Sequence, residues 1–170
     1  MGYSSSELAQ IQTRWNVRFP PDLVDLLSIH RRLIGEPGSF DWLLSDPSDI
    51  QERFDWPLEG FWFDVEHNGL WWPEWGEKPS GPAEQRARLK EALAGVPKLI
   101  PLFGHRYLPA EPFEAGNPVF SVYQADIIPY GANLQDWIQR EHGSWDTSPW
   151  PALKEIPFWS EAVRRNGDLP

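Results

Sequence analysis

The dipeptide Asn68-Gly69 is the feature that most constrains how this chain can fold. It lies inside the aromatic segment 61–75, FWFDVEHNGLWWPEW. Asn-Gly favours a type I′ turn between two antiparallel strands, because both central residues of that turn need positive φ. Aromatic and β-branched residues on either side are typical of strands. The sequence therefore predicts a two-residue hairpin in which His67 pairs with Leu70.

The hairpin register divides the segment into two faces, because successive strand residues point to opposite sides. The apolar face, which is expected to join the core, holds Phe61, Phe63, Val65, His67, Leu70 and Trp72. The other face mixes aromatic rings with carboxylates and holds Trp62, Asp64, Glu66, Trp71 and Trp75. We expect this second face to be at least partly exposed, while the exposure of Trp71 and Trp75 stays open.

Periodicity and capping signals predict the remaining elements. Helices are expected over 5–15, 21–34, 46–54 and 82–94, from Asn133 onward, and over 158–165. Strands are expected over 40–44, 98–103, 119–123 and 126–130, with a proline-rich loop at 108–118. This order predicts an α+β fold, with a central, mostly antiparallel sheet on which N-terminal and C-terminal helices pack.

The negative charge is concentrated in one quarter of the chain. The formal net charge is -10, and residues 41–84 hold eleven acids against two bases, a net charge of -9. Six of the eleven tryptophans lie in the same stretch. Acidic segments are usually poor in aromatic residues, so the coincidence points to a functional surface.

Composition also excludes several classes of function. The acidic balance argues against nucleic acid and against an anionic membrane as partners. The chain has no cysteine, and its four histidines are scattered without ligand spacing, so no metal site and no cofactor are expected. The start of the chain carries no targeting signal and no segment is apolar enough to span a membrane, so a cytoplasmic location is expected.

Two sets of residues could still carry chemistry. The carboxylate pairs Asp64/Glu66 and Glu111/Glu114, together with the many tryptophans, fit a carbohydrate-active or carbohydrate-binding protein. The triplet His105-Arg106-Tyr107 could grip an anion, or Arg106 could form an ion pair with an acid such as Asp126 or Asp64. We favour ordinary structural roles for both sets.

Four segments carry a resemblance to a known family. FPPDLVDLLSIH, VPKLIPLFG, NPVFSVY and DIIPYGANLQDWI resemble, in this order, the SUKH superfamily, which includes fungal cell-wall-assembly regulators and bacterial immunity proteins. The resemblance covers about residues 15–140 and implies one α+β domain over 1–170, with a Trp- and Pro-rich extension at 141–170. It also implies no active site, and a bacterial member would bind and neutralise a toxin, often a nuclease.

Together these features predict a non-enzymatic module that binds a basic protein partner, possibly a nuclease-like toxin domain, as a monomer or weak homodimer. The partner-binding residues are expected to be Trp62, Asp64, Glu66, Trp71, Glu74, Trp75 and Glu77. Aromatic rings would supply buried area and carboxylates would supply charge-assisted contacts. The alternatives are the carbohydrate function and self-association through the aromatic strip.

Overall fold

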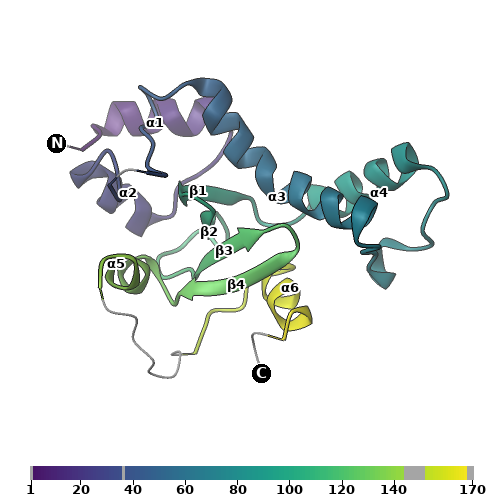
Figure 1. Cartoon of the computed structure of the whole chain (residues 1–170). Coiled ribbons are helices and arrows are strands. Elements are labelled where there is room, and N and C mark those ends of the chain that lie inside the picture. The colour runs from purple at the N-terminus through teal and green to yellow at the C-terminus, as the bar shows by residue number, and fades with distance from the viewer. Residues whose placement is uncertain (1, 36, 144–151, 168–170) are drawn as a thin grey trace.

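The computed structural model describes residues 2–35, 37–143 and 152–167 of the chain. The described residues form helices on either side of a small sheet (Figure 1). The helices are α1 (Ser5–Arg14), α2 (Pro21–Ile29), α3 (Pro47–His67), the 3₁₀ helix η1 (Pro73–Trp75), α4 (Pro82–Ala94), α5 (Leu134–His142) and α6 (Trp159–Arg165). The strands are β1 (Leu99–Phe103), β2 (Arg106–Pro109), β3 (Val119–Tyr123) and β4 (Asp126–Gly131).

The four strands form an antiparallel meander in the order β1-β2-β3-β4. Helices α5 and α6 pack on β4, and α3 packs on β1 and β3. The predicted α+β fold with an antiparallel sheet is confirmed, as are the strands expected at 98–103, 119–123 and 126–130. Strand β2 was missed, because it is only four residues long and ends in a proline that resembles the loop after it.

Side-chain caps mark the starts of α1, α3 and α5. Ser4 and Glu7 form the predicted capping box at α1, and the Asn133 side chain accepts a hydrogen bond from the Asp136 N–H at the start of α5. Helix α2 begins at Pro21 as predicted but ends at Ile29, before the expected end at Ile34. The strand predicted at 40–44 is wrong, since residues 42–44 form a turn closed by the hydrogen bond from Ser45 N–H to Asp41 O.

The predicted hairpin at 61–75 is also wrong. The helix expected to end near Phe54 continues through Pro57 to His67, so the first predicted strand is helical. Asn68 is the C-cap of α3, and Gly69 follows with φ of +72°. A glycine in the left-handed region is the usual stop after a helix, and it needs the same positive φ as a type I′ turn. Asn68-Gly69 therefore ends a helix instead of joining two strands.

Helical spacing of apolar residues explains why α3 is so long. Ile50, Phe54, Leu58, Phe61 and Val65 recur every three or four residues, and each is buried or half-buried. This stripe spans the whole helix, whereas the alternation at 61–67 covers only its last two turns. Burial along one continuous helical face therefore outweighs the short period-two pattern.

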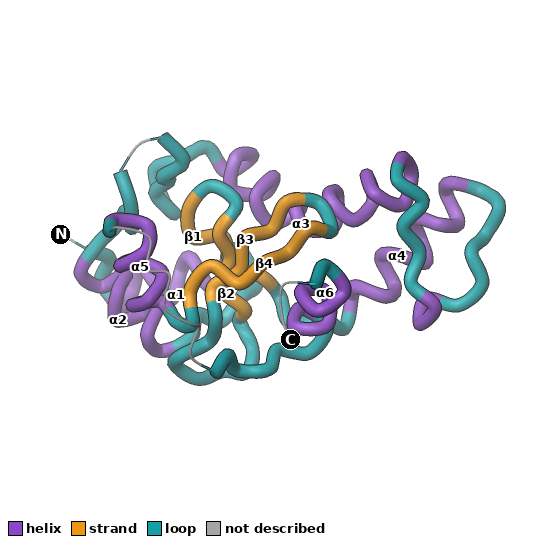
Figure 2. The backbone as a smooth tube through the Cα atoms, turned by 60° about the horizontal axis from the view of Figure 1, so that its bottom comes forward, coloured by secondary structure: helices purple, strands orange, loops and turns teal. Residues whose placement is uncertain are grey.

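The sheet has a core cluster on each side. In β2, Leu108 packs into one cluster with residues of α1 and α2, and Tyr107 packs into the other with residues of α3, α4 and α6. Figures 1 and 2 show the second half of α3 running past the sheet beside α4, with which it is in contact. The other side of α3 carries exposed residues from Asp49 to Glu66.

Candidate functional site

The seven residues predicted to bind a partner lie in different environments. Trp62 and Trp71 are half-buried, while Glu66, Glu74 and Glu77 are exposed. Asp64 and Trp75 are buried, with 9% and 6% of their surface exposed. The structure therefore does not place the seven residues on one exposed strand face.

Asp64 holds a turn of the sheet against α3. Its Oδ2 accepts a hydrogen bond from the Ala125 N–H at 2.8 Å, and its Oδ1 accepts one from the Asn68 side chain at 2.5 Å. The predicted exposure of this carboxylate is wrong, because a helical position faces the sheet where a strand position would have faced solvent. Asp64 and Glu66 also lie two residues apart on a helix and thus on different sides, so they do not form the pair that carbohydrate chemistry would need.

Trp75 belongs to an aromatic cluster under η1. Its ring stacks on Trp72 with a centroid separation of 5.0 Å and meets Phe61 edge-on at 6.3 Å. Trp71 packs edge-on against it at 5.4 Å and donates from Nε1 to Gly76 O. Trp75 is therefore a core residue, whereas Trp71 is half-buried.

Two residues of the predicted set, Glu74 and Trp62, have cationic partners within the chain. Glu74 forms an ion pair with Arg165 at 2.7 Å, which holds the pKa of the Glu74 carboxyl below its usual range. The guanidinium of Arg86 lies 5.3 Å from the centroid of the Trp62 ring. Glu74 and Trp62 thus fasten α6 and α4 to their neighbours, and the predicted site is mainly structural.

A different surface emerges on the uncovered side of α3. Residues seven apart on a helix lie within about 20° of each other around its axis, so they form rows. One row holds Asp49, Trp56 and Phe63, and the row beside it holds Glu52, Glu59 and Glu66; all six residues are exposed. Trp56 and Phe63 have 42% and 43% of their surface exposed, so two large apolar side chains meet solvent within one row. We call these six residues the α3 face.

The β3–β4 turn extends this face with another aromatic ring. Gly60 lies against the turn so closely that a Cβ there would be 2.7 Å from Gln124 Cα. The indole N–H of Trp56 donates to Val122 O at 2.9 Å, and the Trp56 and Tyr123 rings are 6.1 Å apart. Tyr123, 55% exposed, therefore stands beside a tryptophan whose orientation is fixed.

A pocket of about 400 Å³ opens where the start of α3 meets the sheet turns. It is lined by Asp49, Glu52, Arg53, Trp56, Gly104, His105, Tyr107 and Tyr123. The buried hydroxyl of Tyr107 donates to the backbone oxygen of Arg53 at 2.7 Å. This bond fixes the inner wall of the pocket, and burial raises the pKa of that hydroxyl.

Two of the lining residues, Arg53 and His105, could carry positive charge. The Arg53 guanidinium lies 4.8 Å from the Phe40 ring centroid and reaches Gly104 O at 3.4 Å. Burial, and then the charge of Arg106, lowers the pKa of His105, so its imidazole is neutral at pH 7. Among the described residues, neither Asp49 nor Glu52 forms an ion pair with a lysine or an arginine. Glu59, by contrast, is paired with Arg86.

Arg106, from the triplet after β1, has a structural role. Its Nη1 donates to Ser121 Oγ at 2.9 Å, and its guanidinium lies 3.5 Å from the Tyr130 ring centroid. Its Nε is 3.5 Å from a carboxylate oxygen of Glu141. An ion pair was expected, but the acid is Glu141 on α5 and neither Asp126 nor Asp64.

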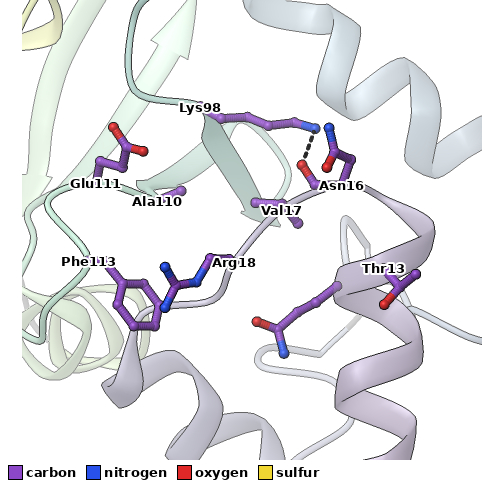
Figure 3. Close-up of a pocket in the computed structure, with 9 residues that line it drawn as sticks. Thr13, Asn16, Val17, Arg18, Lys98, Ala110, Glu111 and Phe113 are labelled. Atoms are coloured by element: carbon purple, nitrogen blue, oxygen red, sulfur yellow. Dashed lines mark hydrogen bonds between the residues drawn. The ribbon is translucent and has the colours of Figure 1, made fainter.

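A second hollow, of about 380 Å³, lies between the end of α1 and the loop after β2. Figure 3 shows the Arg18 guanidinium against the Phe113 ring, where the separation is 3.7 Å, and Lys98 directed toward the end of α1. Lys98 donates to Trp15 O at 2.8 Å. Both cations are used within the fold, so this hollow offers less to a ligand than the pocket beside α3. Glu111 and Glu114, which lie nearby, do not form a pair of available carboxylates, because Glu114 forms an ion pair with Lys154 at 2.8 Å.

Among the described residues, no group of three His, Asp or Glu side chains is arranged to hold a metal ion. No helix in the described ranges is both long and apolar enough to cross a membrane. Comparisons with protein-family models, curated proteins and solved structures found no match. The resemblance to the SUKH superfamily therefore stays a prediction.

Proposed function

We propose that this chain is a non-enzymatic protein-binding module that binds a basic protein partner through the α3 face. The observation that carries the proposal is the exposed aromatic row of Trp56 and Phe63 beside the acidic row of Glu52, Glu59 and Glu66. An immunity-type or regulatory role in the cytoplasm, as a monomer or weak homodimer, is the form that the sequence resemblance favours.

The two rows would act in different ways. Aromatic anchors at the centre of an interface carry much of its binding energy, about 2 kcal/mol or more each at hot spots. The hydrogen bond from Trp56 to Val122 O fixes that ring before binding, so less side-chain entropy is lost on association. The carboxylates attract a positive partner and raise the association rate, mostly at low salt.

The charge of α3 indicates the kind of partner. The helix carries six acids and one arginine, so its formal charge is 1 − 6 = −5. A domain that contacts the phosphate backbone must present a basic surface. A nuclease-like toxin domain is therefore the partner that best fits both the charge and the resemblance.

The test compares three forms of the full chain. The face variant is Glu52→Lys/Glu66→Lys, and the matched control is Asp25→Lys/Glu111→Lys, which changes the charge equally at exposed sites away from α3. Proteins captured by the wild type from cells of the source organism are purified, and their dissociation constants are measured by calorimetry for all three forms.

A partner that uses the α3 face should bind the face variant at least about tenfold more weakly, which corresponds to about 1.4 kcal/mol. The control should bind as the wild type does. The proposal fails if the face variant binds as tightly as the control, or if every captured protein is insensitive to both variants.

A further inference from the structure

We propose that the pocket between α3 and the sheet turns receives an arginine side chain of the partner. This inference rests on the proposed function and names the group that anchors the partner to the α3 face. The pocket combines two features that guanidinium recognition needs: exposed aromatic rings and carboxylates without an ion pair in the described chain.

The aromatic side of the pocket is formed by Trp56 and Tyr123. Their rings are tilted by 58° with centroids 6.1 Å apart, so they form an open corner and not a closed stack. Both rings are more than two-fifths exposed. A guanidinium plane can stack on either ring, which is favourable for tryptophan and tyrosine faces.

The acidic side of the pocket is formed by Asp49 and Glu52. They lie three residues apart at the start of α3, hence on the same side of the helix, and both line the pocket. Glu59, two turns beyond Glu52 on the same face, is already paired with Arg86. Asp49 and Glu52 have no arginine or lysine partner among the described residues, so an incoming cation would meet two available carboxylates at the pocket.

The cation that the chain itself contributes does not fill the pocket. The Arg53 guanidinium lies against the Phe40 ring and reaches the oxygen of Gly104, so it is held against the pocket wall. His105 packs edge-on against Tyr123 with a centroid separation of 6.2 Å and is uncharged at neutral pH. Neither side chain replaces a cation between the aromatic corner and the two carboxylates.

Arginine fits this arrangement better than lysine does. Its planar fork can donate two parallel hydrogen bonds to a carboxylate while its face stacks on a ring. A lysine ammonium is a compact, strongly hydrated charge that gains less from an open aromatic corner. The geometry therefore favours an arginine anchor within the basic surface of the partner.

The test uses the full chain labelled with ¹⁵N and three small probes: the N-acetyl amides of arginine, lysine and citrulline. The indole N–H signal of Trp56 reports on the pocket, and a Trp56→Phe variant identifies it. The arginine probe should shift this signal and saturate in the millimolar range, with lysine at least fivefold weaker and uncharged citrulline without effect.

Variants then assign the carboxylates. Asp49→Asn/Glu52→Gln should weaken the arginine probe about tenfold, while Asp25→Asn/Glu111→Gln should not change its affinity. Equal binding of citrulline, equal binding of lysine, or no effect of Asp49→Asn/Glu52→Gln would overturn the inference. An unshifted Trp56 signal would do so as well.

The outcomes separate this inference from the proposed function. If a partner depends on the α3 face but the arginine probe does not bind, the arginine pocket is wrong and the protein-binding function stands. If the probe binds at Trp56 but no protein depends on the face, the pocket is real and the proposed function is wrong.

Discussion

Asp64→Ala provides a direct test of how the β3–β4 turn is held to α3. In the folded chain the Asp64 carboxylate accepts from the Ala125 N–H at 2.8 Å and from the Asn68 side chain at 2.5 Å. Alanine removes both acceptors and leaves the part-buried Ala125 N–H without a partner. If Asp64 instead served a partner from an exposed face, as the hairpin predicted, its removal would leave stability unchanged.

The expected loss follows from these two bonds. A buried donor left unsatisfied costs about 1–3 kcal/mol, and the bond to Asn68, which is near solvent, contributes about 0.5–1.5 kcal/mol. We therefore expect Asp64→Ala to lower the free energy of unfolding by about 3 kcal/mol. For a chain of this length, that corresponds to a fall in Tm of roughly 6–12 °C.

The assay is urea denaturation followed by tryptophan fluorescence, together with hydrogen exchange at the Ala125 amide. Asp64→Asn retains one oxygen that can accept from Ala125 and should lose only about 1 kcal/mol. Glu66→Ala, on the exposed side of the same helix, is the matched control and should stay within about 0.5 kcal/mol of the wild type. Equal stability of Asp64→Ala and Glu66→Ala would refute the structural role.

Three further predictions concern the aromatic cluster, the loss of stability at low pH and a buried hydroxyl. Trp75→Ala should cost about 3–5 kcal/mol in urea denaturation, and Trp62→Ala less than half as much; the reverse order would contradict the placement of Trp75 in the core. Because Arg165 holds the folded-state pKa of Glu74 below its usual range, their pair stabilises the fold above about pH 4.5, and this contribution is lost as the pH falls through the folded-state pKa. The fall in unfolding free energy between about pH 4.5 and pH 3 should therefore be smaller in Arg165→Ala, and an equal fall would count against the pair. Burial raises the pKa of Tyr107, so this hydroxyl should not ionise near pH 10 in the folded protein. In alkaline titration, Tyr107→Phe should therefore show the same tyrosine absorbance change near pH 10 as the wild type. A smaller change in the variant would mean that the Tyr107 hydroxyl is accessible.

The sequence was sufficient to predict the elements whose stabilising contacts lie within a few residues of each other. The capping box of Ser4 and Glu7 and the Asn133 cap each satisfy N–H groups at a helix start, and both were readable from the sequence. Strand β3 was predicted with its observed bounds, Val119–Tyr123, because its β-branched and aromatic residues fit a sheet. Strand β2 depends on its two neighbours for pairing, so its own four residues carried little signal.

The hairpin prediction was wrong because the dipeptide Asn68-Gly69 is compatible with two structures. Asn68-Gly69 supplies a positive φ, which a type I′ turn and the end of a helix both require. What decides between them is the preceding chain, where apolar residues from Ile50 to Val65 keep helical spacing. Pro57 hides this continuity in the sequence, since proline usually ends a helix, yet here it is buried inside α3.

The wrong secondary structure changed which residues form the candidate site, but not the kinds of residue expected there. Charge and tryptophan content are properties of residues 41–84 in any conformation, so the expectation of an acidic, aromatic surface did not depend on the hairpin. The identity of the exposed residues did depend on it. A period of two exposes Trp62 and Asp64, whereas the helix exposes Trp56 and Phe63, and only tertiary contact brings Tyr123 beside Trp56.

The α3 face also opposes the stability of its own helix. Glu52 on this face lies three residues from Asp49 and three residues from Asp55, and each such pair of like charges destabilises a helix by about 0.2–0.5 kcal/mol. Exposed Trp56 and Phe63 lose the burial that core positions would give them. Folding alone does not require either feature, and violations of local rules are expected at functional surfaces. A basic partner would relieve both at once, by neutralising the carboxylates and covering the rings.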